Sequence, residues 1–303
     1  MEIEDIRRVL IVGAGTMGRQ IGLQCAIHSY DVILYDIAPD KLEAAKTQIK
    51  SYADRFISFG LLTQEQVDAT MNRITMTKDP KEAATEADLL SESVPENPRL
   101  KGKVFAQFNE LCPPHTIFTT NTSDLIPSMF AQNTGRPAQF AALHFHMYVW
   151  DTKLVDIMPH PGTSKETVEL LKAFAKRIGQ IAIVLEKENY GYVFNAMLTS
   201  LNRAALTLVV NGVASFEDVD RAWMLATKMT IGPFGSADLV GLDLCWHIAD
   251  YWGKRLGDRQ LGSIADFLKK EYIDNGWLGM KSGQGFYTYP NPAYQQPAFL
   301  AIE

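Results

Sequence analysis

The chain has few cysteines, and their placement predicts neither a disulfide framework nor a paired-cysteine zinc site. Its 303 residues include 3 cysteines, Cys25, Cys112 and Cys245, an odd number at wide spacing. Such a set is typical of buried free thiols in a reducing compartment. The first residues also lack the apolar stretch of a secretory signal. We therefore expect a cytoplasmic protein.

The sequence also lacks an excess of basic charge and a long uninterrupted hydrophobic run. Its 29 lysines and arginines are outnumbered by 35 acidic residues, for a net charge of −6. That balance provides no positive field for a phosphate backbone. The most apolar long segment, residues 193–210, contains Asn195, Asn202 and Arg203 and is too polar to span a bilayer. We expect neither a nucleic-acid nor a membrane partner.

The length and the pattern of apolar residues favour two domains. Strand-like runs lie at residues 8–12, 31–35, 74–77, 89–94, 116–120, 140–145, 153–158 and 181–185, with helical segments between them that include residues 101–111, 125–132 and 164–178. Strands that alternate with helices predict an α/β domain with a doubly wound parallel sheet.

After about residue 187 the strand-like runs end, and only helical patterns follow. These patterns cover residues 190–211, 216–227, 236–256 and 264–273. The sequence therefore predicts an α/β domain of the Rossmann type over residues 1–187 and an all-α C-terminal domain over residues 188–303, with a ligand site in the cleft between them.

A glycine-rich loop follows the first predicted strand and opens a helix. It has the pattern G-x-G-x-x-G, formed by Gly13, Ala14, Gly15, Thr16, Met17 and Gly18. The first glycine permits a tight turn, the second lets a pyrophosphate approach the backbone, and the third lets helix and strand pack closely. The loop therefore predicts a dinucleotide site, in which Thr16 and Met17 at the helix N-terminus face the phosphates.

Asp36 ends the second predicted strand, at the position where a carboxylate can accept hydrogen bonds from both ribose hydroxyls. A carboxylate there repels the extra phosphate of NADP, and the segment Ile37-Ala38-Pro39 offers no arginine to hold it. The predicted cofactor is therefore NAD.

Four ordered blocks carry a resemblance to a known family along nearly the whole chain. They are the loop Gly13–Gly18; Glu92-Ser93-Val94-Pro95-Glu96 with Lys101; Asn121-Thr122-Ser123 with His144-Phe145; and Gly232-Pro233-Phe234 with Asp238, Gly241-Leu242-Asp243 and Ser282-Gly283-Gln284-Gly285-Phe286-Tyr287. With these blocks the chain resembles the 3-hydroxyacyl-CoA dehydrogenase family, including its lambda-crystallin and L-gulonate 3-dehydrogenase branch. The resemblance implies an oxidoreductase of fatty acid metabolism that uses NAD and forms a homodimer through its helical domain.

The resemblance implies that His144 is the catalytic base and that Asp156 orients its imidazole. His144 also ends an apolar strand, which is where an open α/β sheet presents a ligand site. Asp156 lies in the next predicted strand, where the family usually has a glutamate. The alternative is that His144 is a buried core histidine and Asp156 a polar residue at a strand end.

Ser123 and Asn195 match the pair that polarises the substrate oxygen in the family. Glu96, Lys101, Asn121 and Lys281 match positions that contact the cofactor. The alternatives are that Ser123 caps a following helix, and that the charged residues belong to a solvated helix face and an exposed tail.

The segment after His144 departs from the family pattern. An asparagine-containing stretch is replaced by Phe145-His146-Met147-Tyr148-Val149-Trp150, which brings aromatic residues to the pocket wall. The i, i+2 pair His144 and His146 could form a metal site with Asp156. We nevertheless predict no metal, because no further ligand cluster is present and hydride transfer needs none.

The identity of the substrate stays open between a 3-hydroxyacyl-CoA and a free 3-hydroxy acid or sugar acid. Between Lys50 and Lys78, where family members that act on acyl-CoA carry lysines, the only basic residues are Arg55 and Arg73. Dehydrogenases with a catalytic lysine early in the helical domain are disfavoured, since residues 188–227 contain no lysine. A non-enzymatic NAD-binding protein of the crystallin kind is a further alternative.

Overall fold

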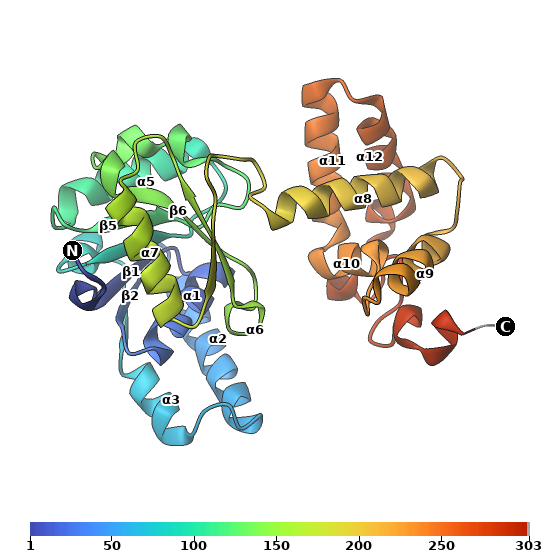
Figure 1. Ribbon diagram of the computed structural model, residues 1–303. Helices are drawn as coiled ribbons and strands as arrows, with labels where there is room; N and C mark the ends of the chain where they lie inside the picture. The colour runs from blue at the N-terminus through green and yellow to red at the C-terminus, as the bar shows by residue number, and fades with distance from the viewer. Residues whose placement is uncertain (302–303) are drawn as a thin grey trace. The chain divides into compact units, whose positions relative to one another are not determined.

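The computed structural model describes residues 1–301 and divides into two compact units, residues 1–195 and the residues from Ala196 onward (Figure 1). Within residues 1–301, no helix combines the length and the apolar character needed to cross a bilayer. Two of the three cysteines, Cys25 and Cys112, are buried as free thiols, whereas Cys245 is partly exposed.

The N-terminal unit is built on one eight-stranded sheet in the order β3-β2-β1-β4-β5-β6-β7-β8. Its strands are β1 (Arg8–Val12), β2 (Asp31–Tyr35), β3 (Ile74–Thr77), β4 (Leu89–Glu92), β5 (Ile117–Thr120), β6 (Phe140–Phe145), β7 (Leu154–Pro159) and β8 (Ile181–Val184). All neighbouring strands are parallel except β6 and β7, which are antiparallel. The predicted α/β class with a doubly wound sheet is confirmed; the sheet is mostly parallel, and the single antiparallel pair was not predicted.

The short connection between β6 and β7 explains the antiparallel pair. It contains only the one-turn helix α6 (Val149–Thr152). A parallel neighbour needs a crossover of a dozen or more residues, and a connection this short returns the chain in the opposite direction.

Helices pack on both faces of the sheet. The helices of this unit are α1 (Thr16–Ile27), α2 (Pro39–Ser58), α3 (Gln64–Met71), α4 (Pro80–Ala84), α5 (Pro98–Leu111) and α7 (Lys165–Arg177). The predicted helix over residues 125–132 is wrong: this stretch contains the 3-10 turn Pro127–Met129 and the start of another, Ala131–Thr134. A residue that precedes a proline rarely adopts the helical backbone conformation. Ile126 precedes Pro127, and its backbone is extended.

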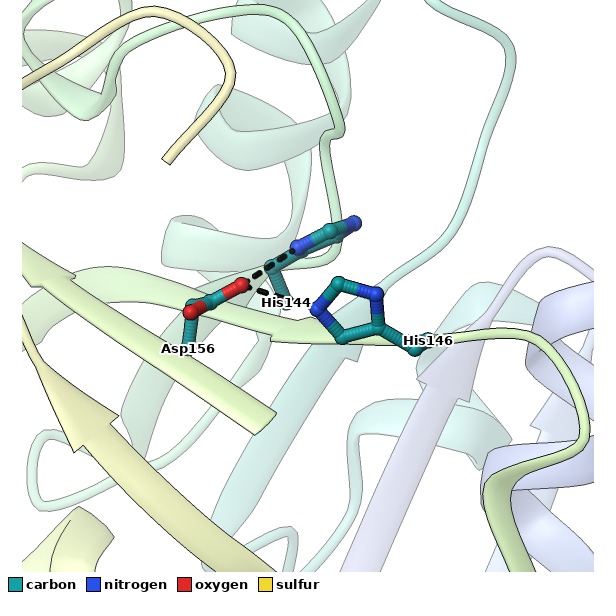
Figure 2. A group of neighbouring side chains, drawn as sticks. All are labelled: His144, His146 and Asp156. Carbon is teal, nitrogen blue, oxygen red and sulfur yellow. Dashed lines mark hydrogen bonds and ion pairs between the residues drawn. The ribbon is translucent and has the colours of Figure 1, made fainter. Parts of the chain in front are cut away.

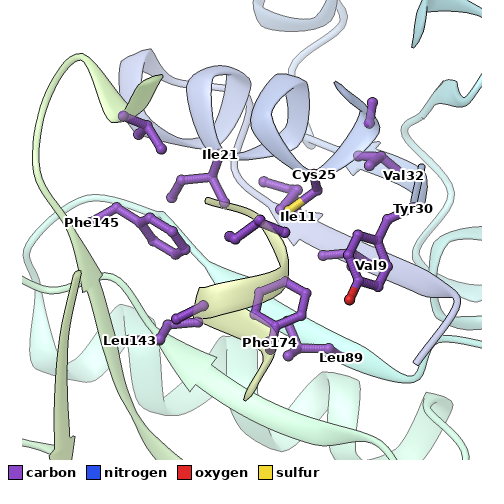
Figure 3. Packing of buried hydrophobic residues seen from close by; sticks show 14 of the residues in the cluster. Val9, Ile11, Ile21, Cys25, Tyr30, Val32, Leu89, Leu143, Phe145 and Phe174 are labelled. Atoms are coloured by element: carbon purple, nitrogen blue, oxygen red, sulfur yellow. The ribbon is translucent and has the colours of Figure 1, made fainter. Parts of the chain in front are cut away.

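The pleat of β1 sends alternate side chains to two separate hydrophobic clusters. Val9 and Ile11 pack in one cluster with Ile21 of α1 (Figure 3), whereas Leu10 and Val12 belong to the other. A strand buried on both faces explains the continuous apolar run in the sequence. It also fixes the end of β1, where the glycine-rich loop begins.

The second unit is helical. Its helices are α8 (Phe194–Val210), which begins at the end of the first unit, α9 (Phe216–Thr227), α10 (Pro233–Val240), α11 (Leu242–Leu256) and α12 (Arg259–Glu271), followed by the 3-10 turns Ile273–Asn275, Met280–Ser282, Ala293–Gln295 and Pro297–Leu300. The prediction of one helix over residues 236–256 is wrong, because Gly241 has a φ of 107° and separates α10 from α11. Residues other than glycine rarely adopt that backbone conformation.

Candidate active site

The glycine-rich loop joins the end of β1 to the N-terminus of α1. A Cβ atom on Gly18 would lie 1.9 Å from the carbonyl oxygen of Gly13, so this position has no room for a side chain. A Cβ atom on Gly15 would meet nothing within 4 Å. The loop is therefore closed on the side of the sheet and open at Gly15.

The open side of the loop has the properties of an anion site. Gly15 and Thr16 are exposed, no side chain among the described residues caps the N-terminus of α1, and its first turn carries no acidic residue. Free backbone N–H groups at a helix N-terminus attract phosphate groups. Met17 differs from its two neighbours because it packs partly against the core.

Asp36 follows β2 and ties the end of that strand to the glycine-rich loop. Its carboxylate accepts hydrogen bonds from the backbone N–H of Ala14 at 2.9 Å and of Ala38 at 3.0 Å. A carboxylate can accept about four hydrogen bonds, so capacity remains for two ribose hydroxyls. The residues present therefore fit a dinucleotide.

His144 and Asp156 lie directly opposite each other in the antiparallel pair β6–β7. Opposed residues of such a pair share one face of the sheet, and Nδ1 of His144 lies 3.2 Å from Oδ2 of Asp156 (Figure 2). Both side chains are buried. The shorter aspartate thus reaches the imidazole without a bridging water, because the two backbones are paired.

His146 contacts the same carboxylate oxygen. It lies two residues beyond His144 and therefore on the same face, and its Nε2 is 2.9 Å from Oδ2 of Asp156. The second oxygen of Asp156, Oδ1, is buried and has no hydrogen-bond partner among the described residues. Two imidazoles therefore converge on one atom of one carboxylate (Figure 2).

Burial and the shared hydrogen bonds set the charges of this group. Burial lowers the pKa of the His144 imidazole below its usual value, although the hydrogen bond to Asp156 opposes that shift. Burial alone raises the pKa of the Asp156 carboxyl, but the hydrogen bonds from His144 and His146 more than reverse this and hold it below its usual value. At neutral pH Asp156 is therefore a carboxylate and His144 a neutral imidazole that donates from Nδ1.

Tyr192 is a residue of this site that the sequence did not reveal. Its ring stacks on His144 with 4.5 Å between the ring centroids, and burial raises the pKa of its hydroxyl well above the usual value. That hydroxyl has no hydrogen-bond partner within residues 1–301. The φ of Tyr192 is 54°, a value that few residues other than glycine adopt. The sequence gives only a weak signal, the preceding Gly191.

A buried ion pair lies between β4 and α5. The ammonium of Lys101 is 2.7 Å from Glu92 and 3.2 Å from Glu96, and its side chain is 1% exposed. The interpretation of Lys101 as part of a solvated helix face is therefore wrong. Burial raises the pKa of the Glu92 carboxyl, although Lys101 and Thr120 both stabilise its charged form.

Glu96 and Asn121 arrange the loop that carries Ser123. Glu96 accepts hydrogen bonds from the Thr122 hydroxyl at 2.5 Å and from the Ser123 N–H at 2.6 Å. The Asn121 side chain accepts one from the N–H of Phe145 at 2.7 Å. The alternative that Ser123 caps a following helix is wrong, because no helix begins here; the Thr122 hydroxyl accepts the N–H of Leu125 within a local turn. Ser123 is itself exposed.

The remaining two predicted site residues are Asn195 and Lys281. Asn195 is in the first turn of α8 and is partly buried. Lys281 belongs to the second unit, where its ammonium lies 2.5 Å from the carboxylate of Asp243.

Models of two domains of one family match the chain. Residues 8–189 match "3-hydroxyacyl-CoA dehydrogenase, NAD binding domain", and residues 191–289 match "3-hydroxyacyl-CoA dehydrogenase, C-terminal domain". The chain is 34% identical to a probable 3-hydroxybutyryl-CoA dehydrogenase of Bacillus subtilis, over 94% of this chain and 98% of that relative. It is 32% identical to the human mitochondrial hydroxyacyl-coenzyme A dehydrogenase, over 94% of this chain and 91% of the human protein.

Solved structures agree with these matches. A diketoreductase that acts on dicarbonyl compounds superimposes with a TM-score of 0.89 at 36% identity, over 94% of this chain and 99% of that chain. The (S)-3-hydroxybutyryl-CoA dehydrogenase of Ralstonia eutropha superimposes with a TM-score of 0.84 at 29% identity, over 94% of this chain and 100% of that chain.

Alanine at Gly18 should lower the stability of the protein, whereas alanine at Gly15 should weaken its affinity for NAD. Gly18→Ala places a Cβ against the backbone of Gly13, so we expect a loss of at least about 2 kcal/mol in the free energy of unfolding, measured in urea. Gly15→Ala meets no atom of the chain, so stability should change by less than about 0.5 kcal/mol. Its added methyl group fills the open side of the loop, and the Kd for NAD should rise about tenfold or more. Unchanged NAD affinity in Gly15→Ala would show that the cofactor phosphates lie elsewhere.

Proposed function

Because the chain belongs to the 3-hydroxyacyl-CoA dehydrogenase family, and is therefore an NAD-dependent dehydrogenase that acts on a hydroxyl group, we propose that His144 is its general base and Asp156 the carboxylate that orients it. The observation that carries this proposal is the buried contact between Nδ1 of His144 and Oδ2 of Asp156. It leaves Nε2 of a neutral imidazole free to accept a proton.

In the oxidation direction, Nε2 of His144 takes the proton of the substrate hydroxyl as the C–H bond of the same carbon is broken. Bound NAD would supply the acceptor for the hydride. The imidazole becomes positively charged in this step, and the carboxylate of Asp156 stabilises that charge, as the aspartate of a hydrolase triad does. In reduction the same imidazolium returns the proton to the new alkoxide.

Ser123 and Asn195 polarise the substrate oxygen in this proposal. A hydroxyl and an amide can each donate a hydrogen bond to the oxygen on which negative charge develops. Ser123 suits this role because its loop is held from behind by Glu96, which leaves the residue exposed. Tyr192 acts as a positioning residue, because its stacked ring restricts rotation of the His144 imidazole.

The cofactor-binding residues fall into two groups. Gly13, Gly15, Gly18, the helix start at Thr16 and Met17, and Asp36 would hold the pyrophosphate and ribose, as the open loop and the free acceptor capacity of Asp36 support. Glu96, Lys101 and Asn121 would shape the nicotinamide side. The buried Lys101 acts there through Glu96, and Lys281 is a further proposed contact.

The substrate is a 3-hydroxyacyl-CoA, as the family description implies. A second candidate is a dicarbonyl compound or hydroxy acid without CoA. Two observations favour it. The chain is 36% identical to a diketoreductase, and Arg55 and Arg73 are the only basic residues between Lys50 and Lys78.

The protein is further proposed to be a homodimer. The second unit exposes many large apolar side chains, among them Val213, Leu225, Met229, Leu239, Leu244 and Leu256. Exposed apolar surface of this kind is typical of an interface between chains. Sedimentation equilibrium at micromolar concentration should give twice the chain mass of 33.8 kDa, and the mass of a single chain would contradict the proposal.

The pH dependence of hydroxyl oxidation should report the protonation state of His144 in the His144–Asp156 pair, the dyad. The pKa of His144 is lowered, so its basic form is retained down to below about pH 6.5 and kcat/KM should fall only under that value. His144→Asn should reduce kcat by about 10²-fold or more with NAD affinity unchanged. Asp156→Asn removes a group that raises the pKa of His144, so the remaining activity should persist to lower pH.

Asp151→Asn is the matched control for Asp156→Asn, because Asp151 is exposed in the neighbouring helix α6. It should leave both kcat and the pH profile unchanged. A His144→Asn variant that keeps full turnover would remove the base assignment, and an Asp156→Asn profile shifted to higher pH would remove the proposed electrostatic role.

A spectrophotometric comparison of substrates tests the two candidates directly. Purified protein is assayed with NADH against acetoacetyl-CoA and against free dicarbonyl compounds, and with NAD against free 3-hydroxy acids and gulonate. We expect the highest kcat/KM with acetoacetyl-CoA. Activity confined to the compounds without CoA would overturn the acyl-CoA assignment and favour the second candidate.

A further inference from the structure

The three side chains in Figure 2 place three metal-ligand atoms together. Nδ1 of His144, Nε2 of His146 and a carboxylate oxygen of Asp156 all lie within 4.8 Å of one another. Two of the separations are 3.2 and 2.9 Å. Ligand atoms about 2.0–2.2 Å from one tetrahedral zinc ion lie roughly 3.3–3.6 Å from each other. The two separations are somewhat shorter than that, so small side-chain shifts would place the three donors around a single ion.

In contrast to the expectation from the sequence, we propose that His144, His146 and Asp156 form a binding site for a divalent transition metal ion such as Zn²⁺, and that the bound ion switches the dehydrogenase off. Two imidazoles and one carboxylate suit zinc, cobalt and nickel, whereas magnesium and calcium prefer oxygen ligands alone. Three protein ligands also leave one tetrahedral position for water.

The burial of the group supports an ion at this position. Oδ1 of Asp156 is buried with no hydrogen-bond partner among the described residues. A buried acceptor without a partner is costly. A cation beside the carboxylate lowers that cost.

Aromatic rings hold both imidazoles in place before any ion arrives. Tyr192 stacks on His144 at 4.5 Å, and Phe194 packs edge-on against His146 at 5.7 Å between ring centroids. The strand pairing in turn fixes Asp156 opposite His144. Little side-chain freedom is left to be lost on binding, which favours affinity. The site is also within reach of solvent, because the side chain of His146 is 11% exposed.

Metal binding and base catalysis exclude each other through the tautomers of His144. A neutral imidazole carries one proton. When Nδ1 binds the ion, that proton moves to Nε2, and the proton on Nε2 of His146 likewise moves to its Nδ1. No proton is gained or lost overall, but Nε2 of His144 can no longer accept the substrate proton. This inhibition rests on the proposed function, whereas the binding of the ion does not.

The test uses the full-length protein after treatment with EDTA. Zn²⁺ is titrated in competition with a chromophoric chelator, and Co²⁺ binding is followed by its visible absorption. The wild type should bind one ion per chain, with the intense absorption bands of tetrahedral cobalt. His146→Gln and His146→Leu should each weaken binding tenfold or more, whereas His115→Gln, at a histidine whose side chain is 52% exposed, should bind as the wild type does.

Activity is then measured with and without Zn²⁺ for each protein against its own metal-free rate. Zn²⁺ should inhibit the wild type and His115→Gln reversibly, with recovery in EDTA, and Mg²⁺ should not. Absence of saturable zinc binding in the wild type, or zinc binding by both His146 variants as tight as that of the wild type, would overturn the site. Stoichiometric binding at His146 without inhibition would instead overturn the base assignment of His144 and with it the inhibitory role. Thermal unfolding of each variant confirms that it is folded.

Discussion

The antiparallel register between β6 and β7 is the constraint on which the site depends. In an otherwise parallel sheet, this one reversed pair sets His144 directly opposite Asp156. A shift of one residue would turn one of the two side chains to the other face. The register also brings His146, two residues on, to the same carboxylate. The geometry of the dyad is thus a property of the backbone, and the rotamers of long side chains have little part in it.

The same register explains how an aspartate can reach the imidazole at the position where the resemblance predicts a glutamate. The side chain of Asp156 is one methylene shorter, and direct opposition across paired strands makes up the difference. Burial then decides the protonation states, because it favours the neutral imidazole. Two imidazole donors on one oxygen keep the carboxylate ionised. The outcome is a neutral imidazole that can serve as the proposed base, within a group of donors that also suits a metal ion.

Local patterns allowed the sequence to predict the elements that are proposed to hold the cofactor. The apolar run of β1, the glycine spacing and the position of Asp36 depend on residues close in the chain, and the fold and the NAD-binding assignment are confirmed. The direction of β7 and the break at Gly241 depend on how distant segments pack, which periodicity does not record. Burial of Lys101 and stacking of Tyr192 on His144 were likewise invisible, because each requires a partner brought close by the fold.

The most direct test of this account is the tautomer of His144 in the metal-free protein, measured by ¹⁵N NMR of the histidine rings at neutral pH. The account predicts a neutral imidazole with its proton on Nδ1 and an unprotonated Nε2, and this signal should be absent from His144→Asn. A doubly protonated ring, or a neutral ring with its proton on Nε2, would contradict the claim that Asp156 holds His144 ready to accept the substrate proton.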